Sequence, residues 1–68
     1  MTILEQFIED RLDMVKKHSS DAEFQENLFC QAFGAVEFAC LIYPKYEDEI
    51  GEWWNYSKRN EFRDAIGG

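Results

Sequence analysis

Few residues of this chain could do acid–base or nucleophilic chemistry. His18 is the single histidine, and Cys30 and Cys40 are the two cysteines. Both kinds of mechanism need a positioned pair or triad of titratable groups, and these three residues would form a thiol–imidazole pair only through chance packing. We interpret His18 as a terminal histidine near the dipole of its helix. The sequence therefore predicts no catalytic residue and a protein that is not an enzyme.

The same residues are also poor candidates for a metal centre. Two cysteines ten positions apart and a histidine twelve positions before Cys30 match no zinc-binding spacing. The run YEDE at 46–49 supplies oxygen ligands but lacks the glycine-centred loop of a calcium site. We interpret this run as the solvated acidic first turn of a helix, and we expect no metal and no cofactor.

Charge is unevenly placed along the chain, whose formal net charge is −7. Residues 21–52 carry eight acids against Lys45 alone. Such a segment repels phosphate backbones, which disfavours direct binding of nucleic acid. The apolar run at 39–44 is far too short to span a bilayer. We therefore expect neither a nucleic acid nor a membrane as the partner.

The cysteines indicate a reducing compartment. Cys30 and Cys40 are expected on one helix, where ten residues separate them by about 15 Å, beyond the reach of a disulfide. Free thiols are typical of intracellular proteins. Acids at Glu5, Glu9 and Asp10 interrupt any apolar region of a secretory signal. The expected location is the cytoplasm.

Residues 1–68 have the length and composition of one small domain, with 46% hydrophobic residues. Thr2 and Glu5 have the spacing of a capping box, which begins a first helix that closes with basic residues up to His18. Ser20 and Glu23 form a second capping box, so the second helix starts near Asp21 and ends at about residue 43, before Pro44.

The second helix is apolar around most of its circumference and must be covered from more than one side. It is therefore predicted to be the central helix, with Phe29, Phe33 and Val36 largely buried. Cys30 falls on its narrow polar stripe, and Cys40 falls on the apolar side.

After Pro44, the sequence PKYEDEI is typical of a short helix that begins with proline. A last helix is predicted over 52–66, with Gly67 as its C-cap. The apolar side rotates by more than a quarter turn between Ile50 and Phe62, so we expect a break or bend near Gly51. The predicted fold class is all-α, a small three-helix domain with a possible short extra helix after Pro44.

Two residues allow alternative interpretations. Arg11 lies on the apolar stripe of the first helix and either carries its charge to the edge of that stripe or meets a carboxylate from another helix or a partner. Gly34 weakens the second helix, and it either marks close approach by another backbone or is a tolerated surface glycine.

The adjacent tryptophans suggest an interface, because neighbouring side chains of a helix point in different directions. Trp54 shares a side with Phe62 and Ala65 and is predicted to lie in the core. Trp53 shares a side with Tyr56 and is bordered by acids, as aromatic anchors of protein interfaces often are. The alternative interpretation is a purely structural role for both tryptophans. The predicted partner-binding residues are Trp53, Tyr56, Tyr46, Glu49 and Glu52.

These observations favour a non-enzymatic protein–protein interaction module that binds a protein partner or self-associates. An alternative is an acidic decoy that occupies the nucleic-acid site of a basic protein, with carboxylates drawn from Glu23, Glu26, Glu37 and residues 47–52. A small enzyme is the third and least favoured reading. In size, acidity and lack of catalytic groups, the chain resembles the short accessory proteins carried by bacterial phages and conjugative elements.

Overall fold

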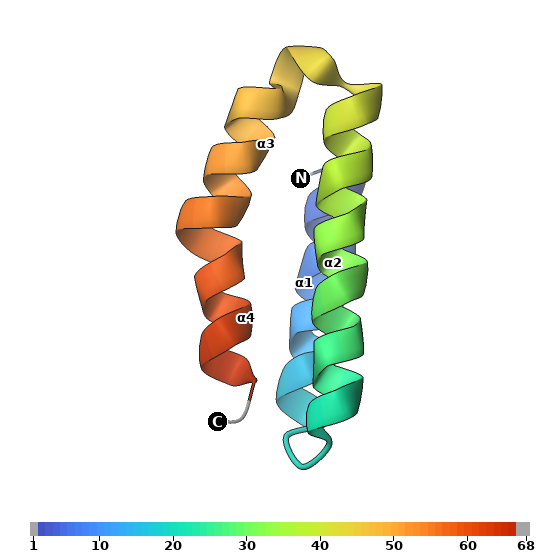
Figure 1. Cartoon of the computed structure of the whole chain (residues 1–68), viewed down its shortest axis with the longest axis vertical. Coiled ribbons are helices and arrows are strands. Elements are labelled where there is room, and N and C mark those ends of the chain that lie inside the picture. Colours follow the sequence, from blue (N-terminus) through green and yellow to red (C-terminus); the bar gives the residue numbers. More distant parts are fainter. Residues whose placement is uncertain (1, 67–68) are drawn as a thin grey trace.

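The computed structural model describes residues 2–66, which are helical almost throughout (Figure 1). Helix α1 spans Ile3–Lys17 and helix α2 spans Ala22–Ile42. A short 3-10 turn, η1 (Pro44–Tyr46), leads into α3 (Glu47–Trp53), a π-helical segment η2 (Trp54–Lys58) and α4 (Arg59–Ala65). The predicted all-α fold with a central second helix is confirmed, and residues 2–66 contain no strand. The proposed cap Gly67 lies outside the described residues.

The N-termini of α1 and α2 are capped by side chains. The backbone N–H of Glu5 donates to Thr2 Oγ1 at 3.1 Å, so Thr2 caps α1 as predicted. The Glu5 carboxylate accepts from the Thr2 hydroxyl at 3.2 Å, whereas in a full capping box it accepts from the backbone N–H of the cap residue. At α2, the N–H of Phe24 donates to Asp21 Oδ1 at 3.1 Å. The predicted cap Ser20 is therefore wrong by one residue, because Asp21 offers the side-chain oxygen nearest to the first free N–H groups.

The core lies between the α1–α2 hairpin and the last helix. Each of the three contributes apolar side chains at helical spacing: Ile8, Leu12 and Val15 from α1, Leu28, Ala32 and Val36 from α2, and Trp54 and Phe62 from the last helix. Trp54 is thus buried as predicted. Burial of these bulky groups is the main favourable term for a domain of this size.

We expected a break or a bend near Gly51. The last helix is a joined stretch from Pro44 to Ala65, so the break is wrong. Gly51 lies inside α3, and the irregularity is the π-helical segment that follows. Ile50, Trp54, Lys58 and Phe62 recur every four residues, which overshoots a 3.6-residue turn by about 40° at each step. A π-helical segment has a wider turn, and it rotates the chain back so that Trp54 and Phe62 reach the same core.

Helix α1 is too short to cover α2. It has 15 residues against 21 in α2, a difference of about 9 Å at the rise of an α-helix. The Gln25 amide meets the Val15 carbonyl near the hairpin turn, so the missing length falls at the C-terminal end of α2, which extends past the N-terminus of α1 (Figure 1). The apolar residues of that end consequently have no helix of the hairpin over them.

Burial along α2 differs from prediction at Phe29 and Phe33. Val36 is buried as expected, whereas Phe29 is only partly buried and Phe33 is 41% exposed. Phe33 meets Trp54 edge-on, with ring centroids 6.2 Å apart. The Phe33 ring therefore covers the edge of the core and keeps one side open to solvent.

Candidate protein interface

The C-terminal end of α2 exposes a group of large apolar side chains. Phe38 is 63% exposed and Leu41 80%, and Ile42 and Tyr43 beside them are also exposed. We call Phe38, Leu41, Ile42 and Tyr43 the apolar end of α2. Isolated exposed apolar residues are ordinary on a protein surface, but a contiguous group is typical of an interaction site.

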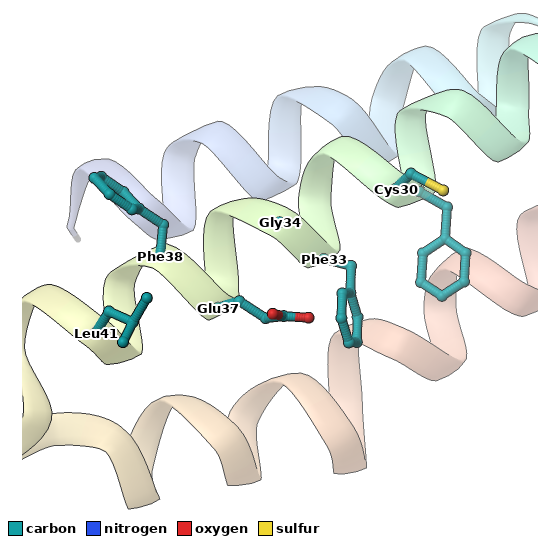
Figure 2. Close-up of a pocket in the computed structure, with 7 residues that line it drawn as sticks. Cys30, Phe33, Gly34, Glu37, Phe38 and Leu41 are labelled. Atoms are coloured by element: carbon teal, nitrogen blue, oxygen red, sulfur yellow. The ribbon is translucent and has the colours of Figure 1, made fainter.

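A shallow hollow runs along α2 from the core toward this apolar end (Figure 2). It is lined by α2 residues alone: Phe29, Cys30, Phe33, Gly34, Glu37, Phe38 and Leu41. Figure 2 shows Phe33 and Glu37 projecting from α2 toward the last helix, whereas Phe38 does not. The hollow is almost entirely apolar apart from the Glu37 carboxylate.

A second depression, which we call the α2–α3 groove, separates α2 from α3. Its α2 wall shares Phe33, Glu37 and Leu41 with the hollow. Its other lining residues are Val36, Cys40, Pro44, Glu47, Asp48, Gly51, Glu52, Trp54, Asn55 and Tyr56. Apolar side chains and carboxylates therefore line one continuous surface that reaches from α2 to α3.

The acids of the groove act together on Cys40. Burial of this thiol raises its pKa above the ordinary value of 9.0, and the nearby carboxylates of Glu47 and Glu37 raise it further. Glu37 comes from α2 and Glu47 from the first turn of α3. Carboxylates on both walls therefore make the electrostatic potential in the groove negative.

An aromatic cluster joins α2 to the last helix beneath the groove. The Trp54 ring lies 5.8 Å from that of Phe29 and 5.7 Å from that of Phe62, measured between centroids. Phe29 and Phe62 stack at 5.8 Å. Such aromatic pairs add about 0.5–1.5 kcal/mol each beyond their buried area. These contacts hold the α2 and last-helix walls of the α2–α3 groove in a fixed arrangement.

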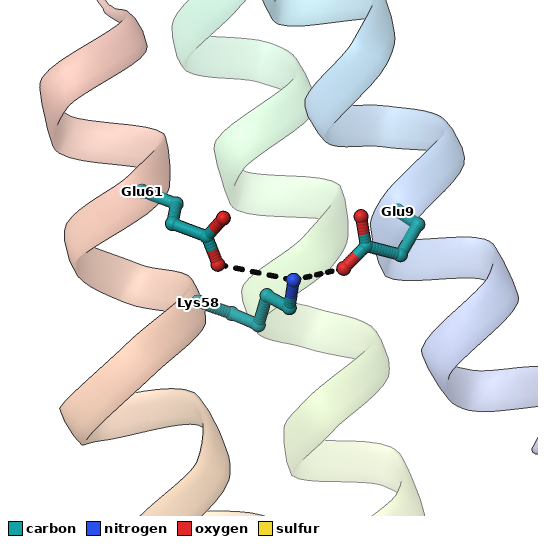
Figure 3. Close-up of polar contacts among 3 residues, drawn as sticks. All are labelled: Glu9, Lys58 and Glu61. Atoms are coloured by element: carbon teal, nitrogen blue, oxygen red, sulfur yellow. Dashed lines mark ion pairs between the residues drawn. The ribbon is translucent and has the colours of Figure 1, made fainter. Parts of the chain in front are cut away.

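Lys58, in the π-helical segment, ties the last helix to α1 (Figure 3). Its ammonium forms ion pairs with Glu9 of α1 and with Glu61, the latter at 3.0 Å. Burial alone would lower the pKa of Lys58, but hydrogen bonds and charge attraction from Glu9 and Glu61 outweigh it, and the net pKa is raised. Lys58 is therefore already paired within the chain.

The five predicted partner-binding residues are not all brought together. Glu52 and Tyr56 line the α2–α3 groove, and the Tyr56 side chain is exposed. Tyr46 and Glu49 are exposed but lie outside the set that lines the groove. Trp53 is partly buried and packs against the core, so only part of its ring is open to a partner. Their role in binding stays a prediction.

The structure distinguishes between the alternative interpretations of Arg11 and Gly34. The Arg11 guanidinium lies 4.4 Å from the centroid of the Phe7 ring and donates to Met14 Sδ at 3.6 Å. Arg11 thus stays along its own helix, which agrees with the first interpretation. A Cβ added at Gly34 would meet nothing within 4 Å, so no other element within residues 2–66 approaches Gly34 closely.

Sequence reasoning did not predict that the apolar end of α2 would be exposed. The available signal was the apolar arc of α2, which is too wide for two neighbouring helices to cover. Periodicity shows the width of such an arc but not which part of it the neighbours leave bare. Which part of α2 stays exposed depends on the length of α1, because the shorter α1 leaves Phe38 and Leu41 uncovered.

The His18 ring meets Phe24 edge-on, with centroids 4.8 Å apart. Within residues 2–66, no group of three His, Cys, Asp or Glu side chains could hold a metal ion. No helix in the same range has both the length and the apolar character needed to cross a membrane.

Comparisons of the chain with protein-family models, curated proteins and solved structures find no match.

Proposed function

We propose that the chain is a non-enzymatic protein–protein interaction module whose contact surface is centred on the apolar end of α2. The observation that carries this proposal is the exposure of Phe38 and Leu41 beside Ile42 and Tyr43. Covering apolar surface gains about 25 cal/mol per Å², and the described helices leave these side chains exposed.

Further support comes from the packed aromatic side chains around Trp54. Trp54 is buried and contacts the rings of Phe29 and Phe62 in tilted arrangements, so the groove that Trp54 lines is held in place before any partner arrives. Preformed surfaces lose less conformational entropy on binding. The two free thiols suit a cytoplasmic setting, and a role as an accessory protein of a phage or mobile element rests on size and acidity.

Site-specific photo-crosslinking in native host cells tests the proposal. A photoreactive phenylalanine analogue replaces Phe38 in one variant and Gln6, an exposed residue of α1, in a matched control. We expect a discrete protein adduct, with a partner or a second copy, from position 38 and not from position 6. Equal labelling at both positions, or no adduct at position 38, contradicts the proposal.

An acidic decoy is the second candidate, and it is favoured by the exposed carboxylates of Glu37, Glu47, Asp48 and Glu52 along one groove. The two functions respond differently to salt. A decoy held by charge alone loses its affinity as salt screens the charges, whereas apolar contacts persist. Binding that survives in about 1 M salt, where the screening length is about 3 Å, supports the apolar interface.

A further inference from the structure

The α2–α3 groove combines apolar side chains with unpaired acids. Phe33 and Leu41 contribute exposed apolar surface from α2. Glu37, on the same helix, projects toward the last helix, and the α3 acids Asp48 and Glu52 line the same groove. These carboxylates are exposed, and no lysine or arginine among residues 2–66 forms an ion pair with them. An occupant that completes this surface must therefore supply apolar groups and positive charges together.

A second copy of the chain is a poor occupant. In a two-fold dimer, each copy presents the same surface to the other, so the acidic walls would face acidic walls. The chain's net charge of −7 adds longer-range repulsion. Lys45 is the only base within residues 21–52. Charge complementarity thus favours a different, basic protein.

The backbone hydrogen bonding of the groove walls limits which backbone conformation an occupant can adopt. Both walls are helices whose backbone N–H and C=O groups bond within the helix. They offer no strand edge with which an extended peptide could pair. A helical occupant needs no such pairing, because its own backbone hydrogen bonds are internal. It can place anchors at positions i, i+3, i+4 and i+7 into an apolar groove.

We propose that the α2–α3 groove binds a basic amphipathic helix of a partner protein, whose apolar face covers Phe33 and Leu41 and whose lysines or arginines pair with Glu37, Asp48 and Glu52. This inference rests on the proposed function and names the chemistry of its partner. It extends the contact surface from the apolar end of α2 into the groove, with Leu41 common to both.

Three synthetic helical peptides of about 18 residues test the proposal, a length sufficient for a helix to form on a surface. The first has a leucine face flanked by lysines, the second the same leucine face flanked by glutamates, and the third the lysines with glutamine in place of leucine. Fluorescence anisotropy of each labelled peptide is measured against the full chain at physiological salt. We expect the leucine–lysine peptide to bind at least about tenfold more tightly than either of the others.

Two double variants locate the binding. Glu37→Gln with Glu52→Gln removes two carboxylates from the groove, and Glu23→Gln with Glu26→Gln removes two exposed carboxylates from the N-terminal half of α2. Both change the net charge equally. We expect the groove variant to weaken binding of the leucine–lysine peptide by at least about fivefold and the control by less than about twofold.

Each other outcome overturns the inference in a recognisable way. Equal weakening by both variants, or equal binding of the peptide without leucine, means general attraction to an acidic surface. Equal or tighter binding of the leucine–glutamate peptide means that the partner is not basic. Failure of the leucine–lysine peptide to bind removes the groove as its site. The proposed function fails separately, when position 38 gives no specific photo-adduct.

Discussion

The side-chain amide of Gln25 donates a hydrogen bond of 2.9 Å to the backbone carbonyl of Val15. Gln25 is fully buried in the first turns of α2, and Val15 lies in the last turn of α1. The last carbonyls of a helix lack partners within the helix. This bond satisfies one of them inside the core and fixes the register of the α1–α2 hairpin.

Gln25→Leu is therefore expected to destabilise the fold although it adds an apolar group to a buried site. The Val15 carbonyl would stay buried without a donor, at a cost of about 1–3 kcal/mol in the free energy of unfolding. Urea unfolding followed by circular dichroism measures this change. Gln31→Leu, at an exposed position of the same helix, is the control and should alter stability by less than about 0.5 kcal/mol. Equal effects of the two substitutions would show that the buried bond has no stabilising role.

The glycines at positions 34 and 51 are expected to be replaceable. Both lie inside helices, and an added Cβ would meet nothing within 4 Å at either position. Alanine has a helix propensity about 1 kcal/mol better than glycine. Gly34→Ala and Gly51→Ala should each raise the free energy of unfolding by up to about 1 kcal/mol. A loss of stability in Gly51→Ala would mean that the last helix needs a flexible point there after all.

The two thiols should differ in reactivity. Cys30 is exposed, whereas Cys40 is partly buried and its pKa is raised by burial and by Glu47 and Glu37. The thiolate is the reactive form, so at neutral pH Cys40 should react with an alkylating reagent more slowly than Cys30. Single Cys30→Ser and Cys40→Ser variants separate the two rates by mass spectrometry. Faster alkylation at Cys40 than at Cys30 would mean that α2 is rotated from its described orientation.

Lys58 is expected to make stability depend on alkaline pH. Its pKa is raised in the folded chain above the ordinary value of 10.5, so its stabilising effect is complete below that value and is lost as the pH rises through the raised pKa. Glu9 and Glu61 are partly exposed, and solvent therefore limits the effect to about 1 kcal/mol. Thermal melts of the native chain and of Lys58→Met should differ at neutral pH and converge at strongly alkaline pH.

Lys45→Met is the matched control for Lys58, because Lys45 is exposed and forms no ion pair with any of residues 2–66. Its melting temperature should stay close to that of the native chain at neutral pH. A difference between the native chain and Lys58→Met that persisted through the alkaline range would assign the effect to the packing of the lysine stem.

The helices themselves could be predicted because their signals are local. Thr2 and Glu5 mark the start of α1, and Ile8, Leu12 and Val15 repeat at the spacing of one helix face. The burial of Gln25 was not anticipated, although it lies three residues before Leu28 and seven before Ala32, on the stripe that is buried. A polar residue at such a position is a usable signal for a buried hydrogen bond between helices.

The π-helical segment could not be predicted in the same way. The sequence shows that the apolar side rotates between Ile50 and Phe62. That rotation is compatible with either a break in the helix or a local change in the number of residues per turn. No residue type specifies an i→i+5 hydrogen bond. The segment follows from the requirement that Trp54 and Phe62 both reach the core on α2. The exposure of Phe38 and Leu41 likewise follows from the relative lengths of α1 and α2.

Substitutions of Trp53 and Trp54 test how the last helix is oriented against the core. Trp54 is 2% exposed and contacts the rings of Phe29 and Phe62. Trp54→Ala should therefore cost about 3–5 kcal/mol, enough to unfold a domain of this size. Trp53 packs only partly against the core, so Trp53→Ala should cost less, and the variant should stay folded.

Circular dichroism and thermal melting of both variants measure the stability difference, and Phe33→Ala is a graded control. Phe33 keeps 41% of its surface exposed, so its truncation should cost less than that of Trp54. The photo-crosslinking experiment, repeated with Trp53→Ala, then tests the predicted role of this ring in binding. A folded Trp53→Ala variant with an undiminished adduct at position 38 would remove Trp53 from the interface. Loss of the adduct without loss of fold would place it there, because hot-spot aromatics contribute about 2 kcal/mol or more to binding.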